Sequence, residues 1–298
     1  MSTAGNAYQG LLKVLSRLPI IGNLVRRRAW YPYRHHLVLL FGSRQNYTFT
    51  QFVRLPHQGD ALGGPVIDFL RPGNGREPLR VLIFGCSNGA EPYSMASILA
   101  SRRPDLPFHM TATDIDKGMI EKALTARYTR EEVTKNAFVD GPFLASTFRQ
   151  DGESLEVRPE LRARITFEMG DVLDAGLISR TAPADIVVAQ NFLYHLNRRQ
   201  ARTAFIHLCS LLKPRAALFV DGMDIDLRQA LSKKAGLLPL DDLIAEIHND
   251  AMALRGAPWP WTYWGLEPLN TARKDWKQRY ATIYLRDQPS IAAPTPPL

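Results

Sequence analysis

The chain has 298 residues, of which 45% are hydrophobic and 22% are charged, an ordinary balance for a folded globular protein. Its length allows one large α/β domain with additional segments or two smaller domains, and no apolar run reaches the length of a membrane span. Cys86 and Cys209 lie far apart and belong to no CxxC or Cys/His cluster. This spacing argues against a disulfide framework and a metal site and favours a reducing, cytoplasmic location.

The formal net charge of +8 arises from the start of the chain. Of 37 Lys and Arg residues, eight precede the first acidic residue, Asp60, which leaves 29 against 29 Asp and Glu. Such a basic arm suits an acidic partner, an anionic membrane surface or nucleic acid. A solvated arm that packs on its own domain has the same composition, so both interpretations stay open.

Residues 11–25, LLKVLSRLPIIGNLV, have apolar positions at helical spacing, and Pro19 interrupts them. Charges inside the apolar stretch argue against a secretory signal, and the segment suits an interfacial helix or a helix packed on the domain. We therefore predict a basic N-terminal helical arm over residues 1–47.

A buried strand, a glycine turn and the start of a helix are predicted in residues 79–94, LRVLIFGCSNGAEPYS. Residues 79–84 are apolar apart from Arg80, Gly85 and Gly89 bracket the turn, and Pro92 suits the first turn of a helix. Free backbone N–H groups in such a turn favour an anionic group of a nucleotide-like ligand. The spacing matches neither a Walker loop nor G-x-G-x-x-G, so the turn alone does not identify the ligand.

Strand-like and helix-like segments alternate beyond this turn. Further strands are predicted at residues 108–114, 165–171, 185–191 and 216–222, and helices at 117–126 and 198–212, with a polar section at 129–164. The alternation predicts an α/β fold with a doubly wound, mostly parallel sheet and helices on both faces. Polar residues end several strands, namely Asp114, Asp171, Gln190 and Asn191. Since ligands bind at the carboxyl ends of such strands, we expect one shared crevice with Asp114 at a ribose.

The last part of the chain contains an insert, residues 223–280, before a final predicted strand at 281–287. A helical stretch near residues 240–254 precedes four clustered aromatic residues, Trp259, Trp261, Tyr263 and Trp264. The cluster is typical of either an acceptor pocket or a small aromatic core. Residues 48–287 would form the main domain, and the proline-rich residues 288–298 are predicted to be a disordered tail.

Five segments follow one another in a characteristic order: TFTQFVRLPHQ, FGCSNGAEPYSMA, TATDIDKGMIEKA, ADIVVAQNFLYHL and LCSLLKPRAALFVDG. Their order and spacing resemble the chemotaxis-receptor (CheR-type) methyltransferases, a family of class I S-adenosylmethionine-dependent methyltransferases. The likeness covers roughly residues 48–222 and implies a Rossmann-like methyltransferase fold with S-adenosylmethionine as the cofactor. The first segment, residues 48–58, resembles the part of the family that folds over the cofactor, and we call it the lid segment.

The resemblance implies a cofactor site built from the lid segment, the glycine turn and the strand ends. Glu91 would contact the methionine end, Asp114 the ribose, and Asp171 with Val172 the adenine. The full set of implied cofactor-binding residues is Thr48, Thr50, Arg54, Gly85, Cys86, Gly89, Glu91, Asp114, Ile115, Asp171, Val172, Ala189, Gln190 and Asn191. An alternative interpretation of Glu91 is an acid that the helix dipole favours at a helix start.

The methyl acceptor is less closely specified by the resemblance. The family's N-terminal helical domain is larger than the basic arm of this chain, and His195 stands where the family has an acceptor-side tyrosine. Arg54 could orient a carboxylate acceptor, which needs no base, whereas His195 could deprotonate a hydroxyl. A histidine at a helix start with no chemical role is the alternative. We therefore predict O-methylation of a carboxylate or hydroxyl on a small molecule or a protein side chain, with Arg54 and His195 as candidate catalytic residues.

Two other functions are compatible with parts of the sequence. One is a protein that binds the cofactor without turnover and uses its basic arm as an interaction surface. The other is a nucleic-acid methyltransferase, suggested by the basic arm alone. The fourth strand ends in Gln-Asn-Phe-Leu rather than Asn/Asp-Pro-Pro-Tyr/Phe, and neither cysteine is placed as a pyrimidine nucleophile, which argues against nucleic acid.

Overall fold

The computed structural model describes residues 50–72, 77–255 and 265–287. Their main sheet has seven strands in the order β6-β2-β1-β7-β8-β10-β9. These are β1 (Leu79–Phe84), β2 (Phe108–Asp114), β6 (Ile165–Met169), β7 (Ala184–Gln190), β8 (Leu212–Asp221), β9 (Leu238–Pro239) and β10 (Ile283–Asp287). Neighbours from β6 to β8 run parallel, and β10 is antiparallel to β8 and β9. The doubly wound, mostly parallel α/β sheet predicted from the sequence is confirmed.

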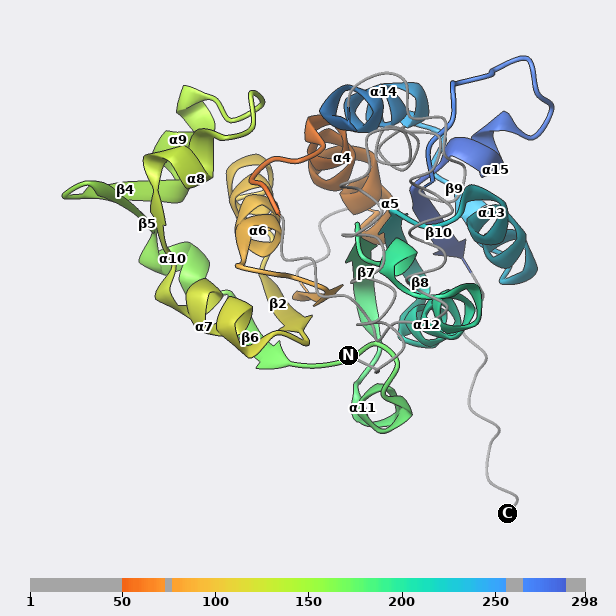
Figure 1. Cartoon of the computed structure of the whole chain (residues 1–298), viewed down its shortest axis with the longest axis horizontal. Helices are drawn as coiled ribbons and strands as arrows, with labels where there is room; N and C mark the ends of the chain where they lie inside the picture. Colours follow the sequence, from red (N-terminus) through yellow and green to blue (C-terminus); the bar gives the residue numbers. More distant parts are fainter. Residues whose placement is uncertain (1–49, 73–76, 256–264, 288–298) are drawn as a thin grey trace, which may run out of the picture.

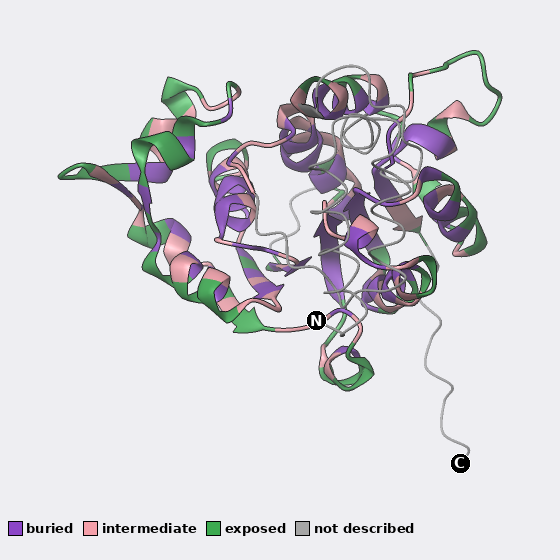
Figure 2. Cartoon of the chain, in the orientation of Figure 1, coloured by how far each residue is buried: buried purple, intermediate pink, exposed green. Residues whose placement is uncertain are grey.

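Successive residues of the central strands pack on opposite faces of this sheet. Ile83 joins a hydrophobic cluster that includes residues of α6 (Ala90–Arg102), whereas Leu82 joins one that includes residues of α12 (Arg198–Ser210). Helices therefore cover both faces, as Figure 1 shows, and the strands between them are largely buried (Figure 2). This burial on two sides explains why β1 and β7, in the middle of the sheet, are largely apolar runs rather than alternating ones.

Most predicted elements lie within two residues of their expected bounds. β1 and β2 have the predicted bounds, and α7 (Lys117–Thr125) follows β2 as expected. The prediction that the fifth strand begins at Ala216 is wrong, because Leu212 already pairs with Ala184 of β7. For the same reason α12 ends at Ser210, before the predicted end of that helix.

The polar section at residues 129–164 folds into a separate small lobe, which the sequence analysis did not predict. It contains a three-stranded antiparallel sheet in the order β3-β5-β4, seen apart from the main sheet in Figure 1. The elements of this lobe are β3 (Arg127–Thr129), α8 (Arg130–Thr134), α9 (Gly141–Thr147), β4 (Phe148–Asp151), β5 (Ser154–Val157) and α10 (Pro159–Arg162). Its strands are short and bury few side chains, so their hydrophobic pattern is weak.

The lid segment leads into three short helices: α4 (Pro56–Ala61), the π-helical turn η2 (Leu62–Val66) and α5 (Ile67–Leu70). The insert contributes α13 (Ile225–Lys234), β9, α14 (Ile244–Arg255) and α15 (Trp276–Tyr280). Figure 1 shows α14 beside α4, far from it in sequence. The helix predicted from residue 240 begins at Ile244, because the Leu240 N–H still donates to the Ile283 carbonyl of β10 at 2.9 Å.

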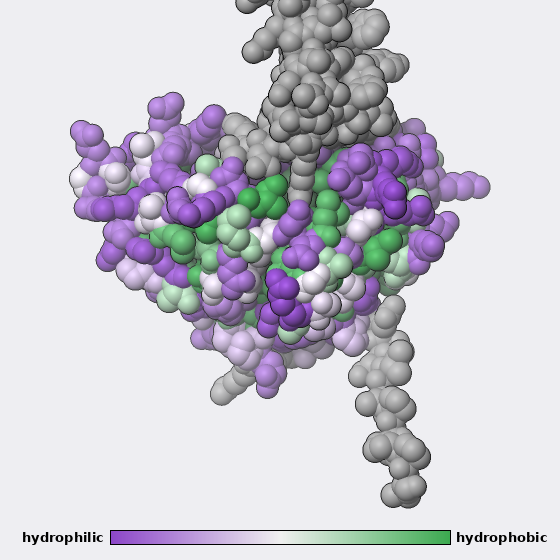
Figure 3. Space-filling model, turned by 60° about the horizontal axis from the view of Figure 1, so that its bottom comes forward, coloured by the Kyte–Doolittle hydropathy of each residue, from purple (hydrophilic) through white to green (hydrophobic). Residues whose placement is uncertain are grey.

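Several predictions fall outside the described residues: the basic arm, Thr48, the four clustered aromatic residues and the tail. Within the described part, none of the helices is both long and apolar enough to traverse a bilayer. Large exposed hydrophobic side chains come from separate elements, namely Leu124, Met169, Ile206 and Leu238. The face drawn in Figure 3 accordingly shows hydrophobic residues in small groups between hydrophilic ones.

Candidate cofactor site

The turn between β1 and α6 has an unusual backbone. Gly85, Ser87 and Gly89 all have positive φ, at 74°, 49° and 90°. A Cβ at Gly85 would lie 2.6 Å from a ring carbon of Phe192, so a larger residue would not fit. The N–H groups of Gly85 and Cys86 both donate to the Thr113 carbonyl, at 2.8 and 3.0 Å. The turn is thereby fixed against the end of β2.

The side chain of Asp114, at the end of β2, binds the backbone of the same turn. Its Oδ2 accepts the Ser87 N–H at 2.8 Å, and its Oδ1 accepts the Asp116 N–H at 2.9 Å. Asp116 in turn caps α7 by accepting the Met119 N–H at 3.1 Å. A carboxylate has about four acceptor positions, so these two bonds orient Asp114 and leave it able to accept others, as from a vicinal diol.

Asp171 and Val172 lie on the loop next to Asp114. The Gly170 N–H donates to the Asp114 carbonyl at 3.0 Å, which joins the ends of β2 and β6. Asp171 accepts the Leu173 N–H at 2.8 Å, and Val172 is buried. The structure therefore brings Asp114, Ile115, Asp171 and Val172 to the ends of adjacent strands, and a shared crevice at these residues stays a prediction.

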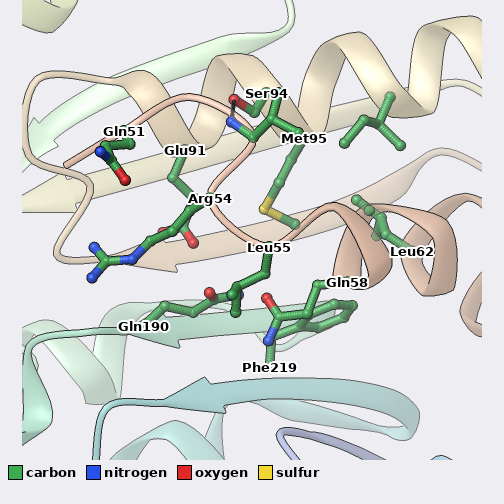
Figure 4. Close-up of a pocket in the computed structure, with 13 residues that line it drawn as sticks. Gln51, Arg54, Leu55, Gln58, Leu62, Glu91, Ser94, Met95, Gln190 and Phe219 are labelled. Atoms are coloured by element: carbon green, nitrogen blue, oxygen red, sulfur yellow. Dashed lines mark hydrogen bonds between the residues drawn. The ribbon is translucent and has the colours of Figure 1, made fainter. Parts of the chain in front are cut away.

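A cavity of about 50 Å³ lies between the lid segment, α6 and the ends of β7 and β8. Its polar lining includes Arg54, Glu91 and Gln190, which reach it from three different elements (Figure 4). The remaining lining residues are Gln51, Val53, Leu55, Gln58, Gly59, Leu62, Ser94, Met95, Ile98 and Phe219. A cavity of this size holds a few water molecules, so it suits a small polar group rather than a whole nucleotide.

The groups around this cavity have opposite effects on the pKa of Glu91. Burial raises the pKa of Glu91 to about 7, against the lowering effect of the Arg54 guanidinium and with a further rise from the Asp221 carboxylate. Glu91 stands in the first turn of α6 and keeps partial access to solvent. Its carboxyl group therefore changes charge in the neutral pH range, next to a permanent cation.

Cys86 lies in the glycine turn, near both Asp114 and Glu91. Burial raises the pKa of its thiol far above the usual range, and the carboxylates of Asp114 and Glu91 raise it further. The thiol therefore stays protonated and is a poor nucleophile. Both carboxylates affect the pKa of Cys86 in the glycine turn. Asp114, predicted to bind the ribose, and Glu91, predicted to bind the methionine end, therefore lie near the same turn.

The segment after β7 is held against the end of β8. The Asn191 N–H donates to the Asp221 carbonyl at 3.0 Å, and the Tyr194 N–H donates to the Gly222 carbonyl at 2.9 Å. Gly222 has φ 64°, and a Cβ there would lie 2.6 Å from the Asn191 Cα. Ala189 and Gln190, at the end of β7, are buried, and Gln190 reaches the cavity.

His195 is not among the residues that line the cavity with Arg54. It ends the 3₁₀ turn η3 (Leu193–His195), is only 8% exposed, and its ring centroid lies 4.1 Å from that of Tyr194. The structure thus places the two candidate catalytic residues in different surroundings. A role for either residue in catalysis stays a prediction.

Two sets of supporting residues were missed by the sequence analysis. Asp221 and Arg228 form a buried ion pair of 3.6 Å at the end of β8, with side chains 2% and 0% exposed. His57 connects the lid segment to the insert, since its Nδ1 lies 2.9 Å from Asp250, and Gln58 connects it to the residue before β10, since it donates to Thr282 at 3.0 Å. These contacts span up to 224 residues, and no local pattern signals them.

A family model described as "CheR methyltransferase, SAM binding domain" matches residues 48–230. The chain is similar to "Probable biofilm formation methyltransferase WspC" of Pseudomonas aeruginosa, at 28% identity over 57% of this chain and 40% of the relative. It is 29% identical to the protein of the same name in Pseudomonas putida, over 82% of this chain and 54% of the relative. It is 25% identical to the "Chemotaxis protein methyltransferase" of Listeria innocua, over 58% of this chain and 63% of the relative. In each case the aligned part is less than two thirds of the relative's length.

Proposed function

The chain belongs to the CheR methyltransferase family, whose S-adenosylmethionine-binding domain it contains, and from this premise we propose that it methylates an oxygen atom of a protein carboxylate. The match over residues 48–230 carries the proposal, because it includes the lid segment, the glycine turn and the polar strand ends. The name "Chemotaxis protein methyltransferase" of the Listeria innocua relative supports a protein as the acceptor.

The chemistry of the site residues fits the proposed cofactor. Asp114 can accept hydrogen bonds from ribose hydroxyls, and Glu91 in its ionised form can pair with the ammonium of the methionine end. The backbone N–H groups of the turn at residues 85–89 suit the cofactor's carboxylate. In this proposal Thr50, Arg54, Ile115, Asp171, Val172, Ala189, Gln190 and Asn191 border the cofactor.

The bound cofactor supplies an activated methyl group for in-line displacement by the acceptor. The chain's own contribution is to align the two reactants and to exclude water. Arg54 orients the acceptor carboxylate through a two-pronged guanidinium, and no base is required because a carboxylate is already anionic. For a hydroxyl acceptor, His195 would have to remove a proton.

Binding and transfer are tested separately. Calorimetry with S-adenosylmethionine and S-adenosylhomocysteine tests the cofactor site. Labelled methyl transfer to candidate proteins, small molecules and mixed RNA and DNA then identifies the acceptor. A carboxylate product is a methyl ester, which releases labelled methanol in mild alkali, whereas a methyl ether is stable.

Each outcome leads to a different conclusion. Alkali-labile label on protein supports the proposal, and alkali-stable label contradicts the carboxylate assignment. Tight cofactor binding without transfer to any acceptor would favour the binding protein without turnover. Absence of binding would overturn the cofactor assignment itself.

A further inference from the structure

Val53, the residue before Arg54, has a backbone conformation that its side chain disfavours. Its φ is 47°, in the left-handed region. A β-branched residue is rarely found there, because its side chain crowds the backbone. This conformation therefore persists only where neighbouring groups stabilise it.

Two buried polar side chains from different parts of the fold bind the backbone of Val53. On the α6 side, Ser94 Oγ accepts the Val53 N–H at 3.0 Å, and the same hydroxyl donates to the Ala90 carbonyl at 2.7 Å. On the small-lobe side, Asn136 Nδ2 donates to the carbonyls of Phe52 and Val53 at 3.0 and 2.8 Å. Ser94 is 5% exposed and Asn136 is 3% exposed, so water does not compete for these bonds.

Asn136 is itself held in place. It lies between α8 and α9, and its Oδ1 accepts the Phe138 N–H at 3.2 Å. Next to it, the ring of Phe52 packs edge-on against Tyr128 and Phe148, with centroids 4.9 and 5.3 Å apart. The small lobe thus contacts the side chain of Phe52 and the carbonyl groups of Phe52 and Val53, the two residues before Arg54.

The Tyr128 hydroxyl extends the same lobe to the glycine turn. It donates to the Asn88 carbonyl at 2.6 Å. The lobe therefore bonds both to the lid segment, which carries Arg54, and to the glycine turn, which leads into α6 and so to Glu91 at the cavity in Figure 4.

We propose that Asn136 is a positioning residue that holds Val53 in its left-handed conformation and thereby directs Arg54 into the cavity beside Glu91. The inference rests on the proposed function, because it assigns cofactor binding to the part of the site that Arg54 completes. Asn136 acts through the lid backbone and touches none of the reacting groups.

The test combines Asn136→Ala with two substitutions of Val53. Both Val53→Gly and Val53→Ala remove the branched side chain, but only glycine adopts positive φ without crowding. We expect Asn136→Ala to raise the dissociation constant of S-adenosylhomocysteine about tenfold, since it removes two hydrogen bonds. Adding Val53→Gly should restore most of the affinity, and adding Val53→Ala should not.

Thr147→Val is the matched control. Thr147 also donates a buried hydrogen bond between the small lobe and α6, to Ser97 Oγ at 2.7 Å, and this bond does not involve the lid segment. We expect this variant to lower the thermal midpoint and to bind S-adenosylhomocysteine as the wild type does. Hydrogen exchange at the Val53 amide, measured without any ligand, should accelerate in Asn136→Ala and not in Thr147→Val.

The outcomes separate this inference from the proposed function. Wild-type affinity and wild-type amide exchange in Asn136→Ala would overturn the positioning role. Equal rescue by Val53→Ala would overturn the role of the left-handed conformation. If the wild type binds no S-adenosylhomocysteine, the proposed function fails, and the exchange measurements still decide whether Asn136 holds the lid backbone.

Discussion

Glu91 carries a carboxyl group whose charge changes near neutral pH, because burial raises its pKa to about 7. The charged groups that act on it are the Arg54 guanidinium and the Asp221 carboxylate, and the nearby Cys86 thiol stays protonated. If the ionised form pairs with the cofactor's ammonium, affinity should rise with pH. We expect the dissociation constant of S-adenosylhomocysteine to be about tenfold larger at pH 6 than at pH 8.

Glu91→Gln is the control for this pH dependence. The amide has no titration in this range, so the variant should bind weakly at both pH values and show a flat profile. A wild-type profile that is already flat would contradict the assignment of Glu91 to the ammonium. Calorimetry at several pH values makes the measurement.

Substitutions of Asp221 and of Arg228, which form a buried ion pair, should move the pH midpoint of cofactor binding in opposite directions. Asp221→Asn removes a negative charge that raises the pKa of Glu91, so the midpoint of binding should move to lower pH. Arg228→Met leaves the Asp221 carboxylate without its cation, so the midpoint should move to higher pH. A midpoint that moves the same way in both variants would indicate general damage to the site.

Stability provides the second readout for this pair. Arg228→Met leaves a buried carboxylate uncompensated, and we expect the free energy of unfolding to fall by about 3 kcal/mol. Asp221→Asn combined with Arg228→Met should recover much of that loss. Denaturant titration of the two single variants and the double variant measures the coupling.

At the scale of elements, Asp250 in α14 of the insert binds His57 in α4, the helix that begins in the lid segment. Asp250 accepts the His57 N–H at 3.1 Å and lies 2.9 Å from the His57 ring nitrogen. Asp250→Ala removes both contacts. We expect the amide groups of α4 to exchange about fivefold faster, which corresponds to about 1 kcal/mol, because the His57 side chain is partly exposed.

The insert offers a matched control for this variant. Asp241 and Lys277 form an ion pair within the insert, and both side chains are about half exposed. Asp241→Ala should leave the exchange of α4 unchanged, since an exposed pair contributes little and does not contact the lid segment. Equal acceleration in both variants would contradict a specific connection between α14 and α4.

At the scale of the whole molecule, Asp185 at the start of β7 binds residues at the start of β1, at the start of β8 and directly after α5. It accepts the Arg80 N–H at 2.9 Å and lies 3.1 Å from Arg71 and 2.8 Å from Lys213. Although burial raises the pKa of Asp185, the Lys213 and Arg80 hydrogen bonds and the nearby cations together lower it. The lowered pKa stabilises the fold above the ordinary value of 3.8, and that stabilisation is lost as the pH falls through the lowered value.

Asp185→Asn should therefore reduce the free energy of unfolding at pH 7. The difference from the wild type should shrink as the pH falls below 3.8, where the carboxylate of the unfolded wild type becomes protonated, until the folded carboxylate is protonated as well. Denaturant titrations at pH 7 and pH 3 compare the two proteins. A difference that stays constant with pH would mean that packing, and not charge, accounts for the loss.

The main sheet was predictable because its strands are buried on both faces. Residues 79–84 are apolar apart from Arg80, residues 108–114 place Phe108, Met110 and Ala112 at alternate positions, and the structure forms β1 and β2 over the same bounds. The strand-end residues Asp114 and Asp171 were predictable from parallel geometry alone, since neighbouring strands deliver their carboxyl ends to one edge.

The small lobe and the supports of the site were not predictable in the same way. β4 buries only Phe148, and an isolated buried residue gives no periodic pattern. Asn136 lies 83 residues from the carbonyl of Val53 that it bonds, and Asp250 lies 193 residues from His57. Such residues have no local pattern, because their role depends on segments that meet only in the folded chain.

The contacts of the lid segment also constrain when the site can form during synthesis. Gln58 is translated 224 residues before its partner Thr282. At about 5–20 residues per second the ribosome needs roughly 10–45 s to reach it. The sheet strands β1, β2 and β6 and the lid contacts to Ser94 and Asn136 can therefore form on the nascent chain before the bond between Gln58 and Thr282 completes the attachment of the lid segment.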